Sequence, residues 1–418
     1  MANDNFTNTR DLLNALAEAM NLINPDIENH HQQTAYLAFM LAKRIGLSER
    51  SVEMSVYAGL LHDVGSVVLE GRKTVMEIES DVRKLSIIGA SMLRDVPSLD
   101  GIADIIELCQ LSWTDLLKNS EKCGGAICDT HRIASLIHLS DTVSLMLKQG
   151  EPVLNQMKCI KDVIGKLGGR EYSQEAVQAF LDLTEIEYIW FDMLYHPTIL
   201  ALLINELHYI SLERTAELTK IMSRIIDYQS AFTAMHSAGV SASAQKLAEL
   251  AGFSLEDCIM MKIAGDLHDV GKLKVPKRIL EKPGKLTAEE FNIIKEHPYN
   301  TRLILMGVQN FEKVADWAGY HHEKLNGRGY PFHFGADRLD TGSRILAVAD
   351  IFSAITERRP YRDSMPKGQV MSVLKENADR GDICKDVVAL LFDHYDEIDS
   401  ARAVASEEAG KRYFESFN

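Results

Sequence analysis

Histidines and aspartates recur at ordered positions in the second half of the chain, and their side chains are of the kinds that hold transition metals. The set comprises His236, His268, Asp269, His297, His321, His322 and Asp350. Imidazole nitrogens combined with carboxylate oxygens suit iron, manganese or zinc rather than calcium. Two metal ions about 3.5–4 Å apart usually share a bridging carboxylate and a bridging water. Six or seven ligands from separate helices would meet that need, so the sequence predicts a two-metal centre.

A single histidine is more often an ordinary core or surface residue than a ligand, so each member of the set says little alone. Here the paired histidines are followed by the turn Gly327-Arg328-Gly329-Tyr330-Pro331. We expect Gly327 and Gly329 to let the backbone turn tightly beside His321 and His322. The combination of ordered ligand positions and a glycine-rich turn favours a metal centre over a set of ordinary core or surface histidines.

Five short motifs resemble those of the HD-GYP family, a branch of the HD-type metal-dependent phosphohydrolases. They are His268-Asp269-Val270-Gly271-Lys272, His321-His322-Glu323, Gly329-Tyr330-Pro331, Ala349-Asp350 and Arg359-Pro360-Tyr361-Arg362. The resemblance covers roughly residues 230–396. It implies that the chain hydrolyses a cyclic dinucleotide such as cyclic di-GMP.

The resemblance also implies how the metals are held. One ion would be bound by His236, His268, Asp269 and Asp350, and the other by His297, His321 and His322, with Asp269 bridging the two. Some family members recruit a third metal through a glutamate four residues before the first histidine. Phe232 stands at that position and cannot be a ligand. We therefore expect two divalent ions, iron or manganese.

The same resemblance assigns the substrate contacts. Lys272 would lie by the scissile phosphate, and Arg359 and Arg362 would contact the phosphates or a guanine. Tyr330 would stack on a base or serve a protein partner, and the sequence does not choose between these. Two metals lower the pKa of a bridging water, so that hydroxide is present near neutral pH and attacks phosphorus. The metals, Asp269 and Lys272 would then make up the catalytic apparatus, with positive charge offsetting that on the phosphoryl oxygens.

The first half of the chain repeats the spacing of the second. His30 precedes Gly46-Leu47-Ser48 by sixteen residues and His62-Asp63-Val64-Gly65 by thirty-two. His236 precedes Gly252-Phe253-Ser254 and His268-Asp269-Val270-Gly271 by the same intervals. Such agreement indicates the duplication of one helical unit.

The first copy keeps only part of the ligand set. His30, His62, Asp63 and Asp141 remain, which is the set for one metal. Ser66 stands at the position of Lys272, and Leu85 at the position of His297. Cys109 and Gln110 stand at the positions of His321 and His322. We expect this half not to be a catalyst, to hold one metal or none, and to serve regulation, dimerisation or support of the second half.

The tandem layout is similar to that of HD-GYP phosphodiesterases from Vibrio that act on 3′,3′-cyclic GMP-AMP. This ring and cyclic di-GMP are therefore both candidate substrates, with a linear dinucleotide as the expected product and mononucleotides as the alternative. A different HD-type hydrolase, acting on nucleotides or phosphate monoesters, is disfavoured by the motifs at 329–331 and 359–362. A signalling module that binds without hydrolysis is disfavoured by the intact ligand set of the second half.

The fold class expected is all-α, with two tandem HD-type domains joined by a long helix. Apolar residues recur at helical spacing, for example at Leu12, Leu13, Leu16 and Met20. The predicted domains are 1–196, degenerate and regulatory, and 231–418, catalytic. Between them, residues 197–230 follow His196-Pro197 as a connecting helix. A coiled-coil dimer seam there is the weaker alternative, and a homodimer remains open.

Composition limits the partners. The net charge is -15, so a nucleic-acid polymer, which needs a broad basic surface, is not expected. Six basic residues between Lys272 and Lys285 could still attract a small anion, although such a run is often only a solvated face. No apolar run reaches the length of a membrane span, and the six scattered cysteines suggest reduced thiols. We expect a cytoplasmic protein without membrane contact.

Overall fold

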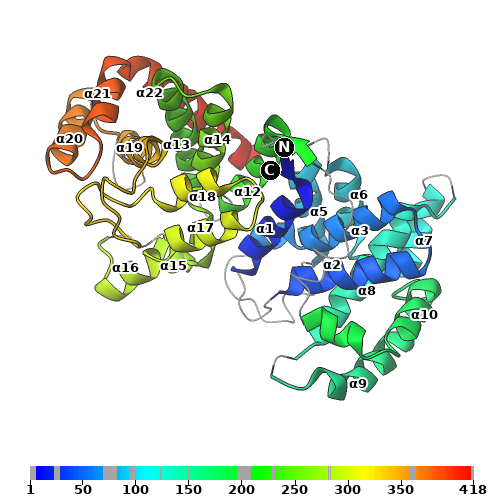
Figure 1. Cartoon of the computed structure of the whole chain (residues 1–418). Helices are drawn as coiled ribbons and strands as arrows, with labels where there is room; N and C mark the ends of the chain where they lie inside the picture. The colour runs from blue at the N-terminus through cyan, green and yellow to red at the C-terminus, as the bar shows by residue number, and fades with distance from the viewer. Residues whose placement is uncertain are drawn as a thin grey trace. The chain divides into compact units, whose positions relative to one another are not determined.

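The computed structural model describes residues 6–22, 29–68, 82–94, 96, 99–122, 125–148, 150–194, 209–227, 231–280, 282, 284–357 and 364–415. Within these ranges the regular structure is helical apart from one two-stranded sheet, which confirms the all-α class (Figure 1). Contacts divide the chain into two compact units. We call Leu16–Leu207 the first unit, and Met1–Ala15 together with His208–Asn418 the second unit.

Helices α2, α3 and α8 form the centre of the first unit, where α2 packs on both of the others. Helix α1 (Thr9–Asn21) leads into this unit. Its remaining elements are α2 (His30–Arg44), α3 (Glu49–Leu61), the 3₁₀ helix η2 (Val64–Val68), α5 (Val82–Arg94), α6 (Asp100–Leu108), α7 (Trp113–Lys122), α8 (Asp129–Met146), α9 (Val153–Gly165) and α10 (Gln174–Leu183).

Helix α13 is the centre of the second unit and packs on α12, α14, α19 and α22. The elements of this unit are β1 (Phe6–Asn8), β2 (Tyr209–Ser211), α12 (Leu212–Asp227), α13 (Ala231–Leu250), α14 (Leu255–Leu267), η4 (Val270–Lys274), α15 (Lys277–Leu280), α16 (Ala288–Ile294), α17 (His297–Met306), α18 (Glu312–Gly319), α19 (Thr341–Thr356), α20 (Lys367–Asp379), α21 (Lys385–Asp393) and α22 (Tyr395–Glu415).

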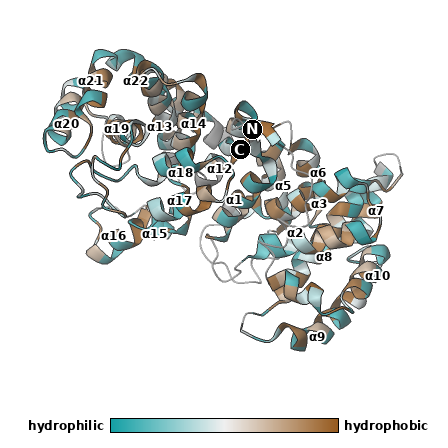
Figure 2. Ribbon diagram, in the orientation of Figure 1, coloured by the Kyte–Doolittle hydropathy of each residue, from teal (hydrophilic) through white to brown (hydrophobic). Residues whose placement is uncertain are grey.

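Most helices have both polar and apolar residues along their length, as Figure 2 shows. The apolar residues fill the core of each unit: Tyr36, Leu37 and Leu41 of α2 are fully buried, as are Ile345 and Phe352 of α19. Burial of such side chains is the main force that holds amphipathic helices together. No helix in the described ranges is both long and apolar enough to cross a membrane.

The turn before the second helix of each copy is built in the same way. Gly46 and Gly252 have positive φ values of 73° and 80°, which glycine adopts without strain. Ser48 and Ser254 then cap the next helix, each accepting a hydrogen bond on its side chain from the backbone N–H three residues later. The repeated Gly-x-Ser motif therefore marks the same helix end and helix start in both units.

Two further pairs of glycines let helices approach closely. A Cβ atom on Gly59 would lie 2.6 Å from Ala35 Cα, and one on Gly265 would lie 2.6 Å from Ser241 Cα. Likewise, a Cβ on Gly65 would meet the Leu85 carbonyl oxygen at 2.1 Å. One on Gly271 would meet the His297 carbonyl oxygen at the same distance. These contacts bring the His-Asp pair of each unit against the neighbouring helices.

The expected single helix over 197–230 is wrong at 209–211, where the chain is a strand. Phe6 pairs with Ser211, and Asn8 with Tyr209, in antiparallel register. The partner strand comes from the other end of the sequence, so local helical periodicity could not reveal it. The helical part that follows, α12, packs on α13 and α14 within the second unit. Residues 197–208 and 228–230 lie outside the described ranges.

We predict that Gly265→Ala lowers the free energy of unfolding by about 1–3 kcal/mol, because the added methyl group would overlap Ser241 backbone atoms. Gly368→Ala is the matched control. Nothing lies within 4 Å of a Cβ at that position in α20, so it should be neutral or stabilising by up to about 1 kcal/mol. Thermal unfolding followed by circular dichroism measures both, and equal melting temperatures for the two variants would contradict the close approach.

Candidate metal centre

The seven candidate ligands of the second unit come from separate elements and meet at one place. Most lie at helix ends: His268 ends α14, Asp269 precedes η4, His297 begins α17, and His321 and His322 follow α18. His236 and Asp350 lie within α13 and α19. Three overlapping groups have ligand atoms within 4.8 Å of one another: His236, His268 and Asp350; His268, Asp269 and His321; and His297, His321 and His322.

Asp269 lies between these groups and is 1% exposed. Its Oδ2 is 3.2 Å from His268 Nε2, and its Oδ1 is 3.3 Å from His297 Nε2 and 3.8 Å from His321 Nε2. The carboxylate thus faces both halves of the cluster. This geometry is suited to bridging two ions.

Three histidines are oriented by the same local bond. Each donates Nδ1–H to the backbone carbonyl three residues earlier: His268 to Gly265 (2.8 Å), His297 to Ile294 (2.7 Å) and His321 to Ala318 (2.6 Å). A carbonyl oxygen can only accept, so the proton is on Nδ1 and the Nε2 lone pair points into the cluster. The end of a helix therefore fixes both the direction and the tautomer of each ring.

The lone pairs at the centre lack proton donors. His297 Nε2 and His321 Nε2 face each other at 3.3 Å, although neither carries a proton in this tautomer. His268 Nε2 and Asp269 Oδ1 are buried and make no hydrogen bond with any described residue. Buried polar atoms are normally satisfied. Nitrogen and oxygen lone pairs that converge without donors fit divalent cations, so these residues suit the two metals expected from the sequence.

Burial keeps most of these histidines neutral. It lowers the pKa of His322 to about 3, with the nearby His297 adding to the shift. It also lowers the pKa of His321 and of His297. A neutral imidazole has the free lone pair that a metal needs. Burial raises the pKa of Asp269, but the facing His268 ring and the Lys272 ammonium outweigh it and hold that pKa well below its usual range.

Glu357 belongs to this centre and was missed from the sequence. His236 Nε2 is 3.1 Å from Asp350 Oδ1, and His236 Nδ1 is 3.2 Å from Glu357 Oε2. Burial opposes a charge on His236, but Glu357 and Asp350 outweigh it and raise its pKa to about 10. Glu357 stands seven residues after Asp350, which is about two helical turns. This spacing puts both carboxylates on the same side of a helix, and it was the signal for Glu357 that the sequence offered.

The glycine-rich turn packs against the paired histidines. A Cβ on Gly329 would lie 2.4 Å from Glu323 Cα, so only glycine fits there. The Glu323 carboxylate accepts hydrogen bonds from the backbone N–H groups of Phe332 (2.7 Å) and Phe334 (3.0 Å). The Tyr330 ring lies 4.8 Å from the His322 ring. The turn thus holds Tyr330 beside the candidate metal ligands.

Lys272 lies at the edge of the centre, with its Nζ 2.5 Å from Asp269 Oδ2. Its side chain is 24% exposed, so it can reach both the cluster and a ligand from solvent. Arg359 and Arg362 lie outside the described residues, and so does the main part of the motif around them.

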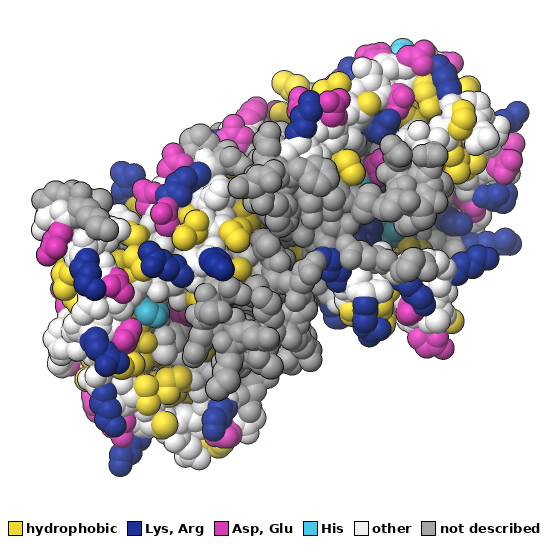
Figure 3. All heavy atoms as spheres, turned by 180° about the vertical axis from the view of Figure 1, so that it is seen from behind, with side chains coloured by type: hydrophobic (Ala, Val, Ile, Leu, Met, Phe, Trp, Pro, Cys, Tyr) yellow, Lys and Arg dark blue, Asp and Glu magenta, His cyan; other side chains and the backbone are white. Residues whose placement is uncertain are grey.

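The basic stretch from Lys272 to Lys285 is partly neutralised. Lys274 pairs with Glu296 at 2.9 Å, and Lys282 pairs with Glu290 at 2.6 Å. Figure 3 shows basic and acidic side chains mixed over one face of the molecule. The stretch therefore has less excess positive charge than its sequence suggests.

The first unit brings its four remaining candidates together as well. His30 Nε2 is 3.1 Å from His62 Nε2 and 3.0 Å from Asp141 Oδ1. His62, Asp63 and His30 form a group of potential ligands. Cys109, at the position of His321, bonds the carbonyl three residues earlier as that histidine does (3.2 Å), and Gln110 donates to Asp141 Oδ2 (3.3 Å). Where the second unit has two imidazoles, the first unit therefore has a thiol and an amide that make hydrogen bonds within the unit.

His31 is a second residue that sequence reasoning missed. It is fully buried, and its ring lies 5.6 Å from His30 and 5.4 Å from His62. Burial and the neighbouring His62 lower its pKa well below the usual value. Its counterpart in the second unit is Ser237, so the spacing of the intact motif gave no signal for it.

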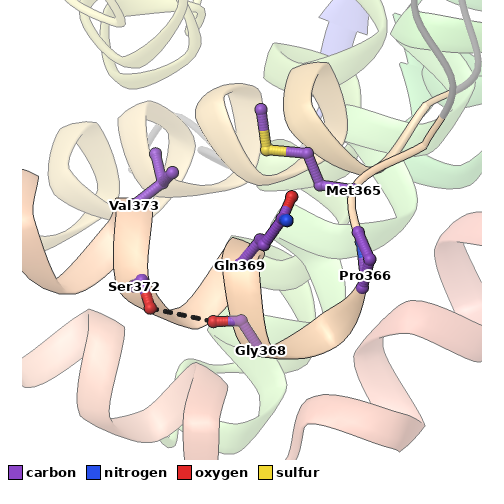
Figure 4. Close-up of a pocket in the computed structure, with 6 residues that line it drawn as sticks. All are labelled: Met365, Pro366, Gly368, Gln369, Ser372 and Val373. Atoms are coloured by element: carbon purple, nitrogen blue, oxygen red, sulfur yellow. Dashed lines mark hydrogen bonds between the residues drawn. The ribbon is translucent and has the colours of Figure 1, made fainter.

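A pocket of about 550 Å³ lies at the start of α20. Figure 4 shows its lining residues: Met365, Pro366, Gly368, Gln369, Ser372 and Val373. None of them is a candidate metal ligand, so this pocket is not the place where the histidines converge.

Comparison with known proteins places this chain among proteins with HD domains. The HD-domain family matches residues 27–142 and again residues 220–383. The chain is 32% identical over 396 residues to 3′3′-cGAMP-specific phosphodiesterase 1 of Vibrio cholerae, which covers 90% of this chain and 89% of that protein. It is 36% identical over 152 residues to a cyclic di-GMP phosphodiesterase of Thermotoga maritima, covering 36% of this chain and 41% of that one.

A solved structure has the same fold. The crystal structure of a cyclic GMP-AMP-specific phosphodiesterase from V. cholerae covers 94% of this chain and 98% of its own, with a TM-score of 0.64 and 20% identity. The chain therefore belongs to the HD-GYP family of cyclic dinucleotide phosphodiesterases and carries two HD domains in tandem.

We predict that the metal-free protein loses stability as the pH falls from about 6.5 to about 4.5, and that His322→Gln removes part of this loss. The unfolded histidine takes up a proton near pH 6.5, whereas the folded pKa is about 3. The unfolded state therefore binds more protons in this window. The wild-type free energy of unfolding should fall by up to about 1.4 kcal/mol more per pH unit than that of the variant. Urea unfolding across the window measures both slopes, and equal slopes would rule out a partly buried, neutral His322.

Proposed function

We propose that the second unit hydrolyses a bacterial cyclic dinucleotide with two divalent metal ions, iron or manganese. The observation that carries this proposal is the convergence of seven candidate ligand side chains, Asp269 among them, in three overlapping groups, with Nε2 lone pairs that meet no proton donor. When bound, the two ions would activate a water between them as hydroxide and stabilise negative charge at phosphorus. Residues 231–418 are the proposed catalytic domain.

The protein's own groups have separable tasks in this proposal. His236, His268 and Asp350 would hold one ion, and His297, His321 and His322 the other, with Asp269 shared. Lys272 would bind a phosphoryl oxygen, since its ammonium group is already held at the edge of the cluster by Asp269. Tyr330, packed on His322, would offer a ring face to a base. Arg359 and Arg362 are proposed as further phosphate or guanine contacts.

Of the two candidate rings, we propose 3′,3′-cyclic GMP-AMP as the preferred substrate and a linear dinucleotide as the product. The support is the extent of the similarity. The Vibrio enzyme named for this ring is similar over both units, whereas the Thermotoga enzyme named for cyclic di-GMP matches about a third of the chain.

We propose that the first predicted domain, residues 1–196, is regulatory and holds a single cation at His30, His62, Asp63 and Asp141. Ser144 donates its hydroxyl to Gln33, so it must accept from His30 Nδ1–H, which leaves the His30 Nε2 lone pair facing inward. His62 donates Nδ1–H to the Gly59 carbonyl, so its Nε2 also faces inward, where Asp63 and Asp141 outweigh burial and raise the pKa of His62 to about 9. The two Nε2 atoms lie 3.1 Å apart beside the buried Asp141 Oδ1, and these surroundings favour a positive charge, which a proton on His62 or a bound cation in its place would supply. A homodimer stays a prediction.

The central test is hydrolysis by purified protein loaded with manganese or ferrous iron. The wild type should cleave 3′,3′-cyclic GMP-AMP faster than cyclic di-GMP, with products resolved by chromatography. Substituting His268→Ala together with Asp269→Ala should reduce the rate by about 100-fold or more, because the charge stabilisation at phosphorus is lost. A metal-loaded wild type that cleaves neither ring would favour the alternative, a module that binds ligand without hydrolysis.

The cation of the first unit is tested in the same variant. With the second centre disabled by His268→Ala and Asp269→Ala, elemental analysis after dialysis should still find about one manganese per chain. Adding His62→Ala and Asp63→Ala should remove it and lower the melting temperature. If the manganese content is the same with and without His62 and Asp63, the first unit holds no cation there.

A further inference from the structure

We infer that Glu357 is a positioning residue that fixes His236 and makes the two metal positions unequal. This inference rests on the proposed metal-dependent function. His236 Nδ1 lies 3.3 Å and 3.2 Å from the two carboxylate oxygens of Glu357. The Nδ1 atoms of the histidines that end α14, begin α17 and follow α18 face neutral backbone carbonyls instead.

A carboxylate acceptor changes the ligand. When Nδ1–H is donated to a carboxylate, the imidazole keeps the right tautomer and its Nε2 becomes a stronger base toward a metal. The ion held by His236, His268 and Asp350 is therefore bound by a more basic imidazole than the ion at His297, His321 and His322. The position beside His236 is the tighter of the two.

The location of Glu357 is unfavourable for folding alone. It is the residue after α19, where a negative charge meets the negative end of the helix dipole. It is only 9% exposed, so its charge also has a desolvation cost. Gly239 leaves room for it, since a Cβ there would lie 3.3 Å from Glu357 Oε1. Its hydrogen-bond partner among the described side chains is His236, and this partnership offsets those costs.

The first unit provides an internal comparison. His30, the counterpart of His236, has its Nδ1 bonded to the Ser144 hydroxyl at 3.0 Å. The equivalent serine of the second unit is Ser353, whose Oγ is buried without a hydrogen-bond partner among the described residues. Seven residues after Asp141 stands Lys148, where the second unit has Glu357. The copy with the full ligand set thus uses a carboxylate where the degraded copy uses a neutral hydroxyl.

The test is manganese binding to full-length Glu357→Gln, measured by calorimetry and by elemental analysis after equilibrium dialysis. The Glu357→Gln variant and the parent protein with which it is compared both carry His62→Ala and Asp63→Ala, so that only ions of the second unit are counted. Glutamine keeps an acceptor oxygen but removes the charge. One of the two dissociation constants should rise about 10–100-fold while the other is unchanged. The melting temperature of the metal-free protein should not fall, and excess manganese should restore hydrolysis.

Glu397→Gln, which removes a carboxylate paired with Lys246 on the surface, is the control that leaves both dissociation constants unchanged.

Two unchanged dissociation constants in Glu357→Gln would overturn this inference alone. So would an equal weakening of both sites with a lower metal-free melting temperature, because that result assigns Glu357 a structural role. A parent protein that binds no manganese would overturn the proposed function, and this inference with it.

Discussion

The second unit depends on one electrostatic constraint, the burial of the Asp269 carboxylate among imidazole lone pairs. Oδ2 receives a hydrogen bond from Lys272, while Oδ1 faces His297 and His321 and receives none. Such an arrangement is costly unless positive charge is supplied. The elements that meet here pack closely, and a Cβ on Gly271 would lie 2.1 Å from the His297 carbonyl oxygen. Stability and metal affinity are therefore coupled in this fold.

The duplication shows which features belong to the fold and which to the chemistry. Both copies keep the glycine turn, the serine cap and the close-approach glycines, because these shape the helices. The ligands have changed without disturbing that frame. Cys109 makes the same backbone contact as His321, so the helix end is preserved while a thiol stands in place of the imidazole. A helical unit of this kind can change the side chains at these positions and keep its helical frame.

Charge is arranged locally rather than over the whole surface. The chain carries a net charge of -15, yet the candidate centre gathers neutral imidazoles and Lys272. Burial keeps His297, His321 and His322 uncharged, whereas the carboxylates of Glu357 and Asp350 favour a charge on His236. A small anionic substrate would respond to this local field and to the ions within it, not to the net charge.

The sequence by itself determined the helical class, the duplication and the residues that converge in the second unit. These follow from local rules: helical periodicity, caps, and ligand types at helix ends. Only the tertiary structure decided the contacts between distant segments. The pairing of residues 6–8 with 209–211 replaced part of an expected helix. The pairing of His236 with Glu357 added a residue that no motif marked. Spacing tells which residues share a helix, but which helix faces another depends on how the whole core packs.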